Sequence, residues 1–284
     1  MQKKIPSSKF YNILINQVPI SKNKHIYFTK LSLTGLEEMH NYSINPKLYE
    51  FLGYKPFKNI NTTKKYLKKL INNQKKNSNN EIKDMGWFIR RKTDNRLIGT
   101  ARLTNIKYSV GHAEWGWGID PDLWGSGYIL DIMEALKEYV FIKLTLNRLW
   151  GQTWKKNKRT IASIKLAGME MEGVHKDGDK DANGKYQDTV SYGIVAKKYF
   201  EDIKKIHKKK KLLSQNEIKK IIRKTLGLQI NSKINSMEST RNWDSLSHIN
   251  VILAIEKKIK YKFNAIEIAQ SNSVENIYNI INKK

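Results

Sequence analysis

The sequence predicts a mixed α+β domain followed by a small all-helical domain. Between positions 25 and 200, segments that alternate apolar and polar residues are interspersed with segments of helical spacing; after position 214 only helical spacing remains. A lysine-rich stretch separates the two patterns. We therefore expect an N-terminal arm (1–24), a mixed domain (25–200), a basic linker (201–213) and a helical domain (214–284), which 284 residues with 39% hydrophobic content can accommodate.

The expected elements of the mixed domain follow from periodicity and turn residues. Met85–Arg91 and Leu97–Lys107 alternate around the turn sequence Thr93-Asp94-Asn95, which predicts a hairpin. The other expected elements are, in order, a strand at 25–33, a helix from Leu36, a helix at 62–72, a strand at His112–Ile119, a helix at 128–143, a strand at Arg148–Trp154, a helix at Lys158–Leu166 stopped by Gly168, and a last pair of strands flanking 181–184 and ending with 189–196.

The helical domain opens with a clear start signal. Ser214, followed three residues later by Glu217, forms a capping box, and Gly227 ends the helix. A second helix is expected from Ser245, a short turn near 265–269 and a last helix near 274–281. Three or four helices in about seventy residues predict a small bundle.

Composition narrows the classes of function. The formal charge of +27 is spread over both parts: residues 1–200 carry 35 Lys/Arg against 18 Asp/Glu, and residues 201–284 carry 18 against 8. This spread does not favour nucleic-acid binding as the primary function, because a nucleic-acid surface would concentrate basic and aromatic residues in one stripe. The positive charge can still attract anionic CoA or acidic proteins. The absence of cysteine excludes disulfides and thiolate chemistry by the protein. No membrane span or signal peptide is recognisable, so a cytoplasmic location is expected.

A glycine loop precedes the helix expected at 128–143. Gly125-Ser126-Gly127 would let the backbone approach an anion at the N-terminus of that helix, where unpaired N–H groups and the helix dipole favour phosphate. The alternative is a tight turn without ligand. The flanking sequence separates the two interpretations.

The stretch Ala113-Glu114-Trp115-Gly116-Trp117-Gly118-Ile119-Asp120-Pro121-Asp122-Leu123-Trp124-Gly125-Ser126-Gly127-Tyr128 resembles the RimJ/RimL branch of the GNAT N-acetyltransferases. The resemblance continues through Tyr139-Val140-Phe141, Leu146-Asn147-Arg148, Asn157 with Thr160, Gly168-Met169, Glu172-Gly173, Gly184-Lys185-Tyr186-Gln187-Asp188 and Tyr192-Gly193-Ile194. Two positions depart from it. Asp122 replaces the usual Gln or Arg, and Thr160 replaces the usual Ser.

The resemblance implies transfer of an acyl group from acetyl-CoA or another acyl-CoA to a primary amine. Such a reaction needs a base for the amine, N–H donors for the oxyanion and an acid for the thiolate. Glu114 is the candidate base, with a solvent-facing strand residue as the alternative. Asn157 is implied to contact pantetheine and Thr160 to protonate the thiolate, with helix capping as the alternative for both and Tyr192 as a weaker candidate acid. The implied cofactor contacts are Trp117, Ile119, Trp124, Gly125, Ser126, Gly127, Tyr128 and Asn157.

No metal site is expected. His112 and His175 lack further ligands at helical or hairpin spacing. The tryptophans Trp115, Trp117 and Trp124 are expected either to wall the substrate site or simply to pack across the sheet.

Residues 214–283 resemble an acyl carrier protein throughout, around Asp244-Ser245-Leu246. This resemblance implies that Ser245 carries 4′-phosphopantetheine, attached by a phosphopantetheinyl transferase and charged by an acyl-loading enzyme; an ordinary helix N-cap is the alternative. One feature departs from the family. Carrier domains are usually acidic along the second helix, whereas here Lys257, Lys258 and Lys260 accompany Glu256.

Three hypotheses follow for the whole chain. The leading one is an N-acyltransferase whose tethered carrier arm delivers the acyl group. The second is an acetyl-CoA-dependent enzyme that acts on a small-molecule amine, a protein N-terminus or an amino sugar, while its carrier serves other enzymes. The third is a catalytically idle domain that docks the carrier.

Overall fold

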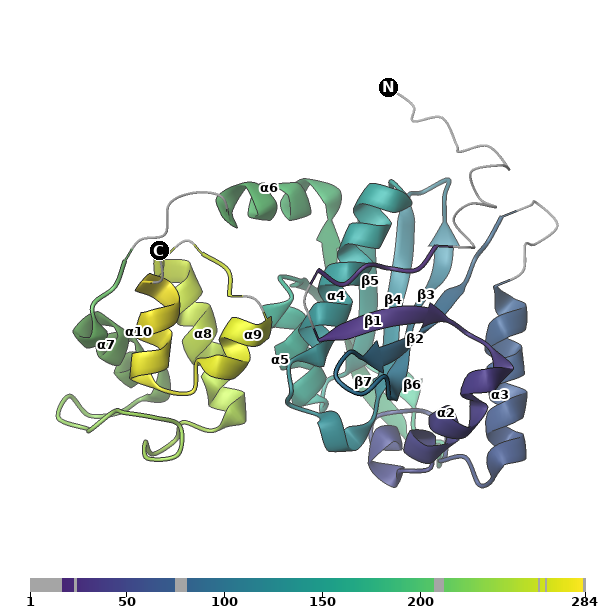
Figure 1. Cartoon of the computed structure of the whole chain (residues 1–284), viewed down its shortest axis with the longest axis horizontal. Coiled ribbons are helices and arrows are strands. Elements are labelled where there is room, and N and C mark those ends of the chain that lie inside the picture. The colour runs from purple at the N-terminus through teal and green to yellow at the C-terminus, as the bar shows by residue number, and fades with distance from the viewer. Residues whose placement is uncertain are drawn as a thin grey trace. The chain divides into compact units, whose positions relative to one another are not determined.

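The computed structural model describes residues 17–22, 25–74, 81–206, 212–259, 261–263 and 265–282. The chain divides into two compact units (Figure 1). The first comprises residues 1–124 and 131–197 and contains the sheet; the second comprises Gly125–Leu130 and residues 198–284 and contains helices α7 to α10. Within the described ranges, no helix is long and apolar enough to cross a membrane. Most of the expected N-terminal arm, the linker residues 207–211 and Lys260 lie outside these ranges.

The first unit is built on a seven-stranded sheet of order β1-β2-β3-β4-β5-β7-β6. Neighbouring strands are antiparallel, except that β4 and β5 are parallel. The strands are β1 (Ile26–Lys30), β2 (Met85–Arg91), β3 (Leu97–Lys107), β4 (His112–Ile119), β5 (Arg148–Trp154), β6 (Glu170–Lys180) and β7 (Tyr186–Val195). The predicted mixed fold is therefore confirmed, with a first strand shorter than the expected 25–33.

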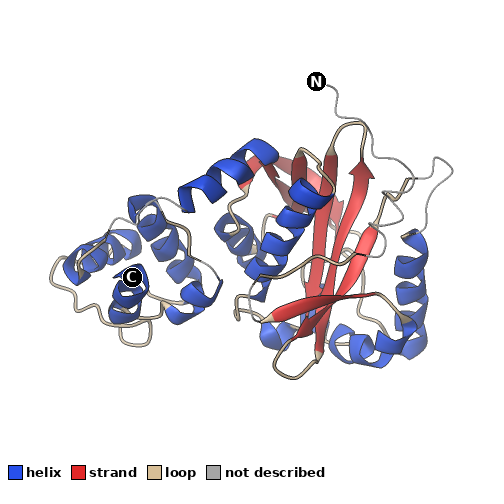
Figure 2. Cartoon of the chain, turned by 45° about the horizontal axis from the view of Figure 1, so that its top comes forward, coloured by secondary structure: helices blue, strands red, loops and turns tan. Residues whose placement is uncertain are grey.

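Helices cover both faces of this sheet, as Figure 2 shows. On one face, α2 (Leu36–Ser43) and α3 (Ile60–Asn73) pack against the strands through a cluster that includes Phe88 of β2. Trp87, the next residue of the same strand, points to the other face and contacts the ring of Tyr139, 5.2 Å between centroids, directly after α4 (Tyr128–Glu138). The alternation of side chains along a strand thus assigns α3 and α4 to opposite faces.

Local signals explain where these helices begin and end. Asn59 accepts a hydrogen bond from Thr62 N–H, so α3 begins at Ile60 rather than at the expected residue 62. α4 ends at Glu138 and is followed by a π-helical turn, Tyr139–Lys143, within the expected 128–143 helix.

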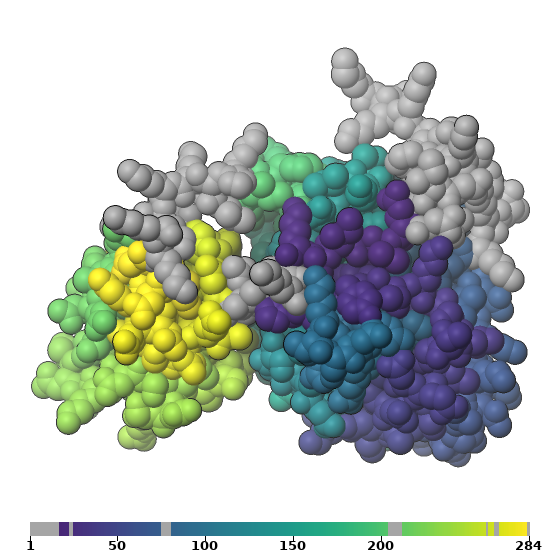
Figure 3. All heavy atoms as spheres, in the orientation of Figure 1, coloured from purple at the N-terminus to yellow at the C-terminus, as the bar shows by residue number. Residues whose placement is uncertain are grey.

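The purple and dark-blue atoms of the segment from β1 to α3 form a continuous part of the surface (Figure 3).

Two further helices follow strands β5 and β7. α5 (Lys158–Leu166) comes after β5, and α6 (Ala196–Ile206) comes after β7 and crosses the boundary expected near residue 200. The ammonium of Lys137 is buried and donates to the carbonyl oxygen of Ala167 at 2.7 Å, which satisfies an acceptor at the end of α5.

The second unit consists of α7 (Gln215–Leu226), α8 (Ser245–Ile259), α9 (Ala265–Gln270) and α10 (Val274–Asn282). The capping box of Ser214 and Glu217 forms as predicted, and Gly227 ends α7 with φ = 65°. Its core consists mainly of isoleucine and valine from α7, α8 and α10, with Leu213, Ile234, Trp243 and Phe263 from the connecting segments; the helical residues are Ile218, Ile222, Val251, Ile252, Ile255, Ile259, Val274, Ile277, Ile280 and Ile281.

Candidate functional site

Strands β4 and β5 separate halfway along β4. They pair only at His112↔Arg148, Ala113↔Leu149 and Glu114↔Trp150, whereas β4 stays paired with β3 as far as Ile119. From Trp115 onward, no described strand pairs with the edge of β4 that faces β5, so the backbone groups there can bind a substrate, apart from the Ile119 carbonyl oxygen, which accepts from the Trp124 indole. Trp117 and Ile119, two of the predicted contacts, lie on this segment.

The glycine loop follows directly. Gly125 and Gly127 have φ of 88° and 79°, a region that glycine enters without strain. A Cβ on Gly125 would meet no atom within 4 Å, so the backbone conformation, and not packing, explains this glycine. α4 begins at Tyr128; in its first turn the Leu130 N–H donates to the Gly127 carbonyl oxygen at 3.0 Å, and the N–H groups at such a helix start point toward the loop. Loop and helix thus have the geometry of an anion site.

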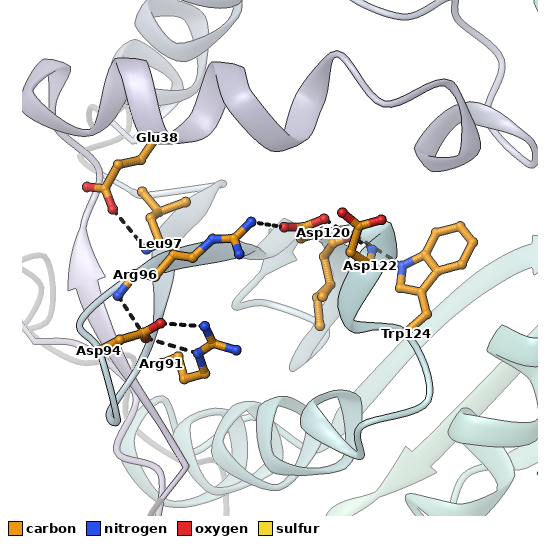
Figure 4. A network of polar contacts seen from close by, with 9 residues as sticks. Glu38, Arg91, Asp94, Arg96, Leu97, Asp120, Asp122 and Trp124 are labelled. Carbon is orange, nitrogen blue, oxygen red and sulfur yellow. Dashed lines mark hydrogen bonds and ion pairs between the residues drawn. The ribbon is translucent and has the colours of Figure 1, made fainter.

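A network of polar contacts fixes the start of this loop, as Figure 4 shows. The buried carboxylate of Asp120 pairs with Arg96 of the β2–β3 hairpin and accepts a hydrogen bond from Asp122 N–H at 3.2 Å. The indole N–H of Trp124 donates to the carbonyl oxygen of Ile119 at 3.1 Å. These hydrogen bonds therefore fix the conformation of the segment between β4 and Gly125.

The hairpin that supplies Arg96 is itself anchored at both ends. Asp94 pairs with Arg91 and accepts from Arg96 N–H, and these hydrogen bonds lower the pKa of Asp94 to about 2. Glu38 of α2 accepts from Leu97 N–H at 2.9 Å and pairs with Arg90. The loop is thus connected through the hairpin to α2. The Arg96–Asp120 pair spans 24 positions, so no local sequence pattern announces it.

Glu114, the candidate base, is the last residue of β4 that pairs with β5. Its half-buried carboxylate accepts a hydrogen bond from the Asn105 side-chain amide at 2.6 Å. The side chain alternates with Trp115 and therefore lies on the α2–α3 face of the sheet. The Glu114 carboxylate is therefore accessible to solvent and lies close to the point where β4 and β5 separate.

The candidate residues of α5 lie at its N-terminus. Asn157 is the N-cap: its side-chain oxygen accepts from Thr160 N–H at 3.1 Å. The capping alternative therefore holds for the Asn157 oxygen, while its amide N–H₂ remains available for a ligand. Thr160 is half-buried, and its hydroxyl has no hydrogen-bond partner among the described residues. Tyr192 is 2% exposed in β7, and burial raises its pKa, which disfavours it as the acid.

The three tryptophans divide into two groups. The rings of Trp115 and Trp117 stack, 4.6 Å between centroids, and Trp115 packs on Gly151 of β5, where a Cβ would come 2.4 Å from the ring. The Trp115 indole N–H is buried and has no acceptor within the described part of the chain. Trp124 instead lies under the Arg159 guanidinium of α5, 4.9 Å from the ring centroid. Arg159 was not among the predicted contacts.

No group of three or more His, Asp or Glu side chains within the described ranges is arranged to hold a metal ion. His175 instead contacts the Ser191 hydroxyl at 3.0 Å, and the His112 ring lies 6.4 Å from that of Trp150.

In the second unit, Ser245 is exposed at the first position of α8. The cap of α8 comes from its neighbour: Asp244 accepts from Leu246 N–H at 3.0 Å and Ser247 N–H at 2.7 Å. The hydrogen bonds from Ser247 lower the pKa of the Asp244 carboxyl most, and the one from Leu246 N–H adds to this effect. Ser245 is therefore not the N-cap, and its hydroxyl has no hydrogen-bond partner in the described part of this unit. That geometry suits a side chain that accepts a phosphodiester.

Behind this turn lies a buried histidine. Trp243 Nε1 donates to His248 Nδ1 at 3.1 Å, and His248 Nε2 is 3.1 Å from the Ser271 hydroxyl. Burial lowers the pKa of His248. Glu256 is also buried, where it accepts from Lys262 and from Phe263 N–H. The exposed charges of α8 are therefore Lys257 and Lys258 alone among its described side chains.

A family model of the acetyltransferase (GNAT) domain matches residues 25–170. The chain belongs to the GNAT acetyltransferase family. Its first unit is accordingly an N-acetyltransferase of the GNAT type, an enzyme class that uses CoA thioester donors.

Among curated GNAT relatives, an uncharacterised N-acetyltransferase p20 of Bacillus licheniformis is 22% identical over 60% of this chain and 92% of its own. A spermidine N(1)-acetyltransferase of Vibrio cholerae is 22% identical over 62% and 96%. A solved structure of spermidine N-acetyltransferase from Vibrio cholerae with CoA and spermine shares the fold, with a TM-score of 0.54, 21% identity and coverage of 63% and 99%. These relatives align with about two thirds of the chain at most.

Proposed function

We propose that this GNAT enzyme moves an acetyl or other acyl group from a pantetheine thioester to a primary amine, with a phosphopantetheine arm on Ser245 as a tethered donor. We place it in the RimJ/RimL branch and residues 214–284 among acyl carrier domains. The observation that carries the transferase part is the separation of β4 from β5 after Glu114, beside a glycine loop with helix N-terminal geometry. The exposed, non-capping Ser245 supports the carrier part.

In this proposal each site residue has one task. The ammonium of the acceptor loses a proton to Glu114, directly or through a water, and the neutral nitrogen attacks the thioester carbonyl. Backbone N–H groups between Trp117 and Ile119 stabilise the oxyanion of the tetrahedral adduct, which collapses with loss of the C–S bond. The Thr160 hydroxyl passes a proton to the leaving sulfur and regains one, through solvent, from the nitrogen that becomes the amide, while Asn157 holds the pantetheine amide with its N–H₂ group.

The glycine loop binds the phosphates of CoA in this scheme. Trp124, Gly125, Ser126, Gly127 and Tyr128 form the turn and the first residue of α4, and Arg159 adds a cation beside Trp124. The arm on Ser245, when present, supplies a thioester of the same pantetheine chemistry as CoA. Tethering raises the local donor concentration to roughly the millimolar range without new contacts.

Intact mass spectrometry tests the carrier part. The chain is co-expressed with a phosphopantetheinyl transferase, alongside Ser245→Ala and the matched control Ser232→Ala in the same unit. We expect one phosphopantetheine adduct on the wild type and on the control, and none on Ser245→Ala. The adduct on all three variants, or on none with several transferases, would refute attachment at Ser245.

Acetyl-CoA turnover tests the transferase part separately. Glu114→Gln removes the base without removing its hydrogen bond to Asn105, so we expect a fall in kcat of about 10²- to 10⁴-fold. Unchanged kcat across pH would remove Glu114 from the mechanism. Turnover of acetyl-CoA without any adduct would favour the acetyl-CoA-dependent alternative, in which the helical domain has another role.

A further inference from the structure

Arg102 lies in the middle of β3, on the same face of the sheet as Glu114. It is in register with Gly86 of β2 and Gly116 of β4. A Cβ on Gly116 would lie 3.9 Å from Nη2 and 4.0 Å from Nε of Arg102, so the guanidinium extends over β4. A cation therefore stands beside the part of β4 that has separated from β5.

This guanidinium has no partner among the described residues: it makes no hydrogen bond or ion pair, although it is half-buried. Four other arginines of the first unit each pair with a carboxylate, in the pairs Arg90–Glu38, Arg91–Asp94, Arg96–Asp120 and Arg148–Glu172. A half-buried charge without a counterion is costly unless a ligand supplies one. Arg102 thus differs from its neighbours in a way that points to a bound anion.

The tyrosine on which the charge of Arg102 acts already has a partner. Tyr54, whose ring lies edge-on to that of Tyr49 at 5.6 Å between centroids, shares a hydrogen bond with Tyr66. Its hydroxyl is therefore engaged, which leaves the Arg102 guanidinium as the group that can bind an anion at this point of the sheet.

The helix over this face adds to the positive potential. α3 exposes Lys64, Lys65, Lys68 and Lys69 and contains no acidic residue. The segment 44–74, which includes α3 and the Tyr54 loop, contains seven lysines and one glutamate. Such a rim attracts anions and repels polycations.

We propose that the acceptor amine carries an anionic group, a carboxylate or a phosphate, and that the Arg102 guanidinium binds it. The inference rests on the proposed function, because it places the amine at Glu114. Glu114 and Gly116 are two residues apart, which corresponds to about 7 Å along β4. The anion and the amine are therefore several bonds apart, as in ω-amino acids or amino-sugar phosphates, and polyamines are poor acceptors.

The test compares matched acceptors with acetyl-CoA as donor. The pairs are 4-aminobutyrate with butylamine and glucosamine 6-phosphate with glucosamine; spermidine is the cationic contrast. Arg102→Gln removes the charge, Arg102→Lys keeps it without the bidentate geometry, and Lys143→Gln, exposed beyond α4, is the control for net charge. Circular dichroism verifies folding of each variant.

We expect wild-type kcat/KM to favour the anionic member of at least one pair, with the carboxylate and phosphate arms showing which anion fits. Arg102→Gln should lower that preference by about 10- to 100-fold, the range of a lost charged hydrogen bond, while Lys143→Gln leaves it unchanged. Equal rates within both pairs, a preference for spermidine, or an Arg102→Gln variant with wild-type preference would each overturn the inference.

Calorimetric binding of the anionic amines in the presence of CoA separates this inference from the proposed function. Binding that Arg102→Gln abolishes supports the anion site even if no acceptor is acetylated, in which case only the proposed reaction fails. Binding that is equal in wild type and Arg102→Gln, or absent in both, overturns the anion site whatever the turnover.

Discussion

Replacing Asp120 should loosen the loop that precedes Gly125. Asp120 is 2% exposed, pairs with Arg96 and accepts from Asp122 N–H, whereas the Arg96 side chain is 48% exposed. Losing the capping acceptor costs about 0.5–2 kcal/mol. Solvent screening reduces the ion-pair share to about 1 kcal/mol because Arg96 is half exposed. We therefore expect Asp120→Ala to lower the free energy of unfolding of the first unit by about 1.5–3 kcal/mol.

Asp120→Asn provides the matched control, since it keeps an acceptor for Asp122 N–H and removes only the charge. Its cost should be about 1 kcal/mol, and a double-mutant cycle with Arg96→Gln should return a coupling of similar size. Urea unfolding measures the stabilities, and KM for acetyl-CoA should rise more in Asp120→Ala than in Asp120→Asn. Equal stabilities of both variants and the wild type, with unchanged KM, would refute the role of this network.

Two further predictions concern backbone and burial. Gly125→Ala should lower the free energy of unfolding by about 1 kcal/mol, because an alanine is strained at its positive φ. Gly151→Ala should lower it by more, up to about 3 kcal/mol, because its Cβ would overlap the Trp115 ring. Thermal unfolding of both variants measures the difference, and an equal loss of stability would contradict it. Acidification should remove the contribution of His248 to the stability of the second unit. Burial lowers the folded pKa of His248, so this contribution is complete above the unfolded value near 6.5 and is lost as the pH falls from there through the folded pKa, whereas the raised pKa of the buried Glu256 acts in the opposite sense. Circular dichroism melts from pH 8 to pH 5 measure this loss, and His248→Gln should flatten the profile; an unchanged slope in that variant would exclude His248 as the cause.

The sequence was sufficient for the elements whose signals are local. The hairpin around Thr93-Asp94-Asn95, the capping box at Ser214 and the glycine end of α7 lie within a few positions of the residues that they organise. The ends of less marked elements were missed for the same reason. α3 begins two residues early because Asn59 caps it, and the end of the expected 128–143 helix is a π-helical turn.

The site was only partly predictable because its remaining contacts are long-range. Arg96 and Asp120 meet across 24 positions, and Arg102 stands out only once the four arginines Arg90, Arg91, Arg96 and Arg148 are seen to pair with carboxylates. Glu256 is an acidic residue of the helix that begins at Ser245, but its carboxylate is buried and accepts hydrogen bonds from Lys262 and from Phe263 N–H. Burial and pairing decide these cases, and neither is visible in spacing.

The central claim is that the arm on Ser245 delivers an acyl group to an amine through the GNAT domain of the same chain. The most direct measurement loads that arm with a labelled acetyl group, removes free CoA, adds an amine and follows the intact mass of the chain with time. The account predicts that acetyl leaves Ser245 and appears on the amine, at a rate independent of protein concentration and greatly slowed by Glu114→Gln. An acetyl group that stays on the arm, or that leaves at the same rate in Glu114→Gln, would contradict it.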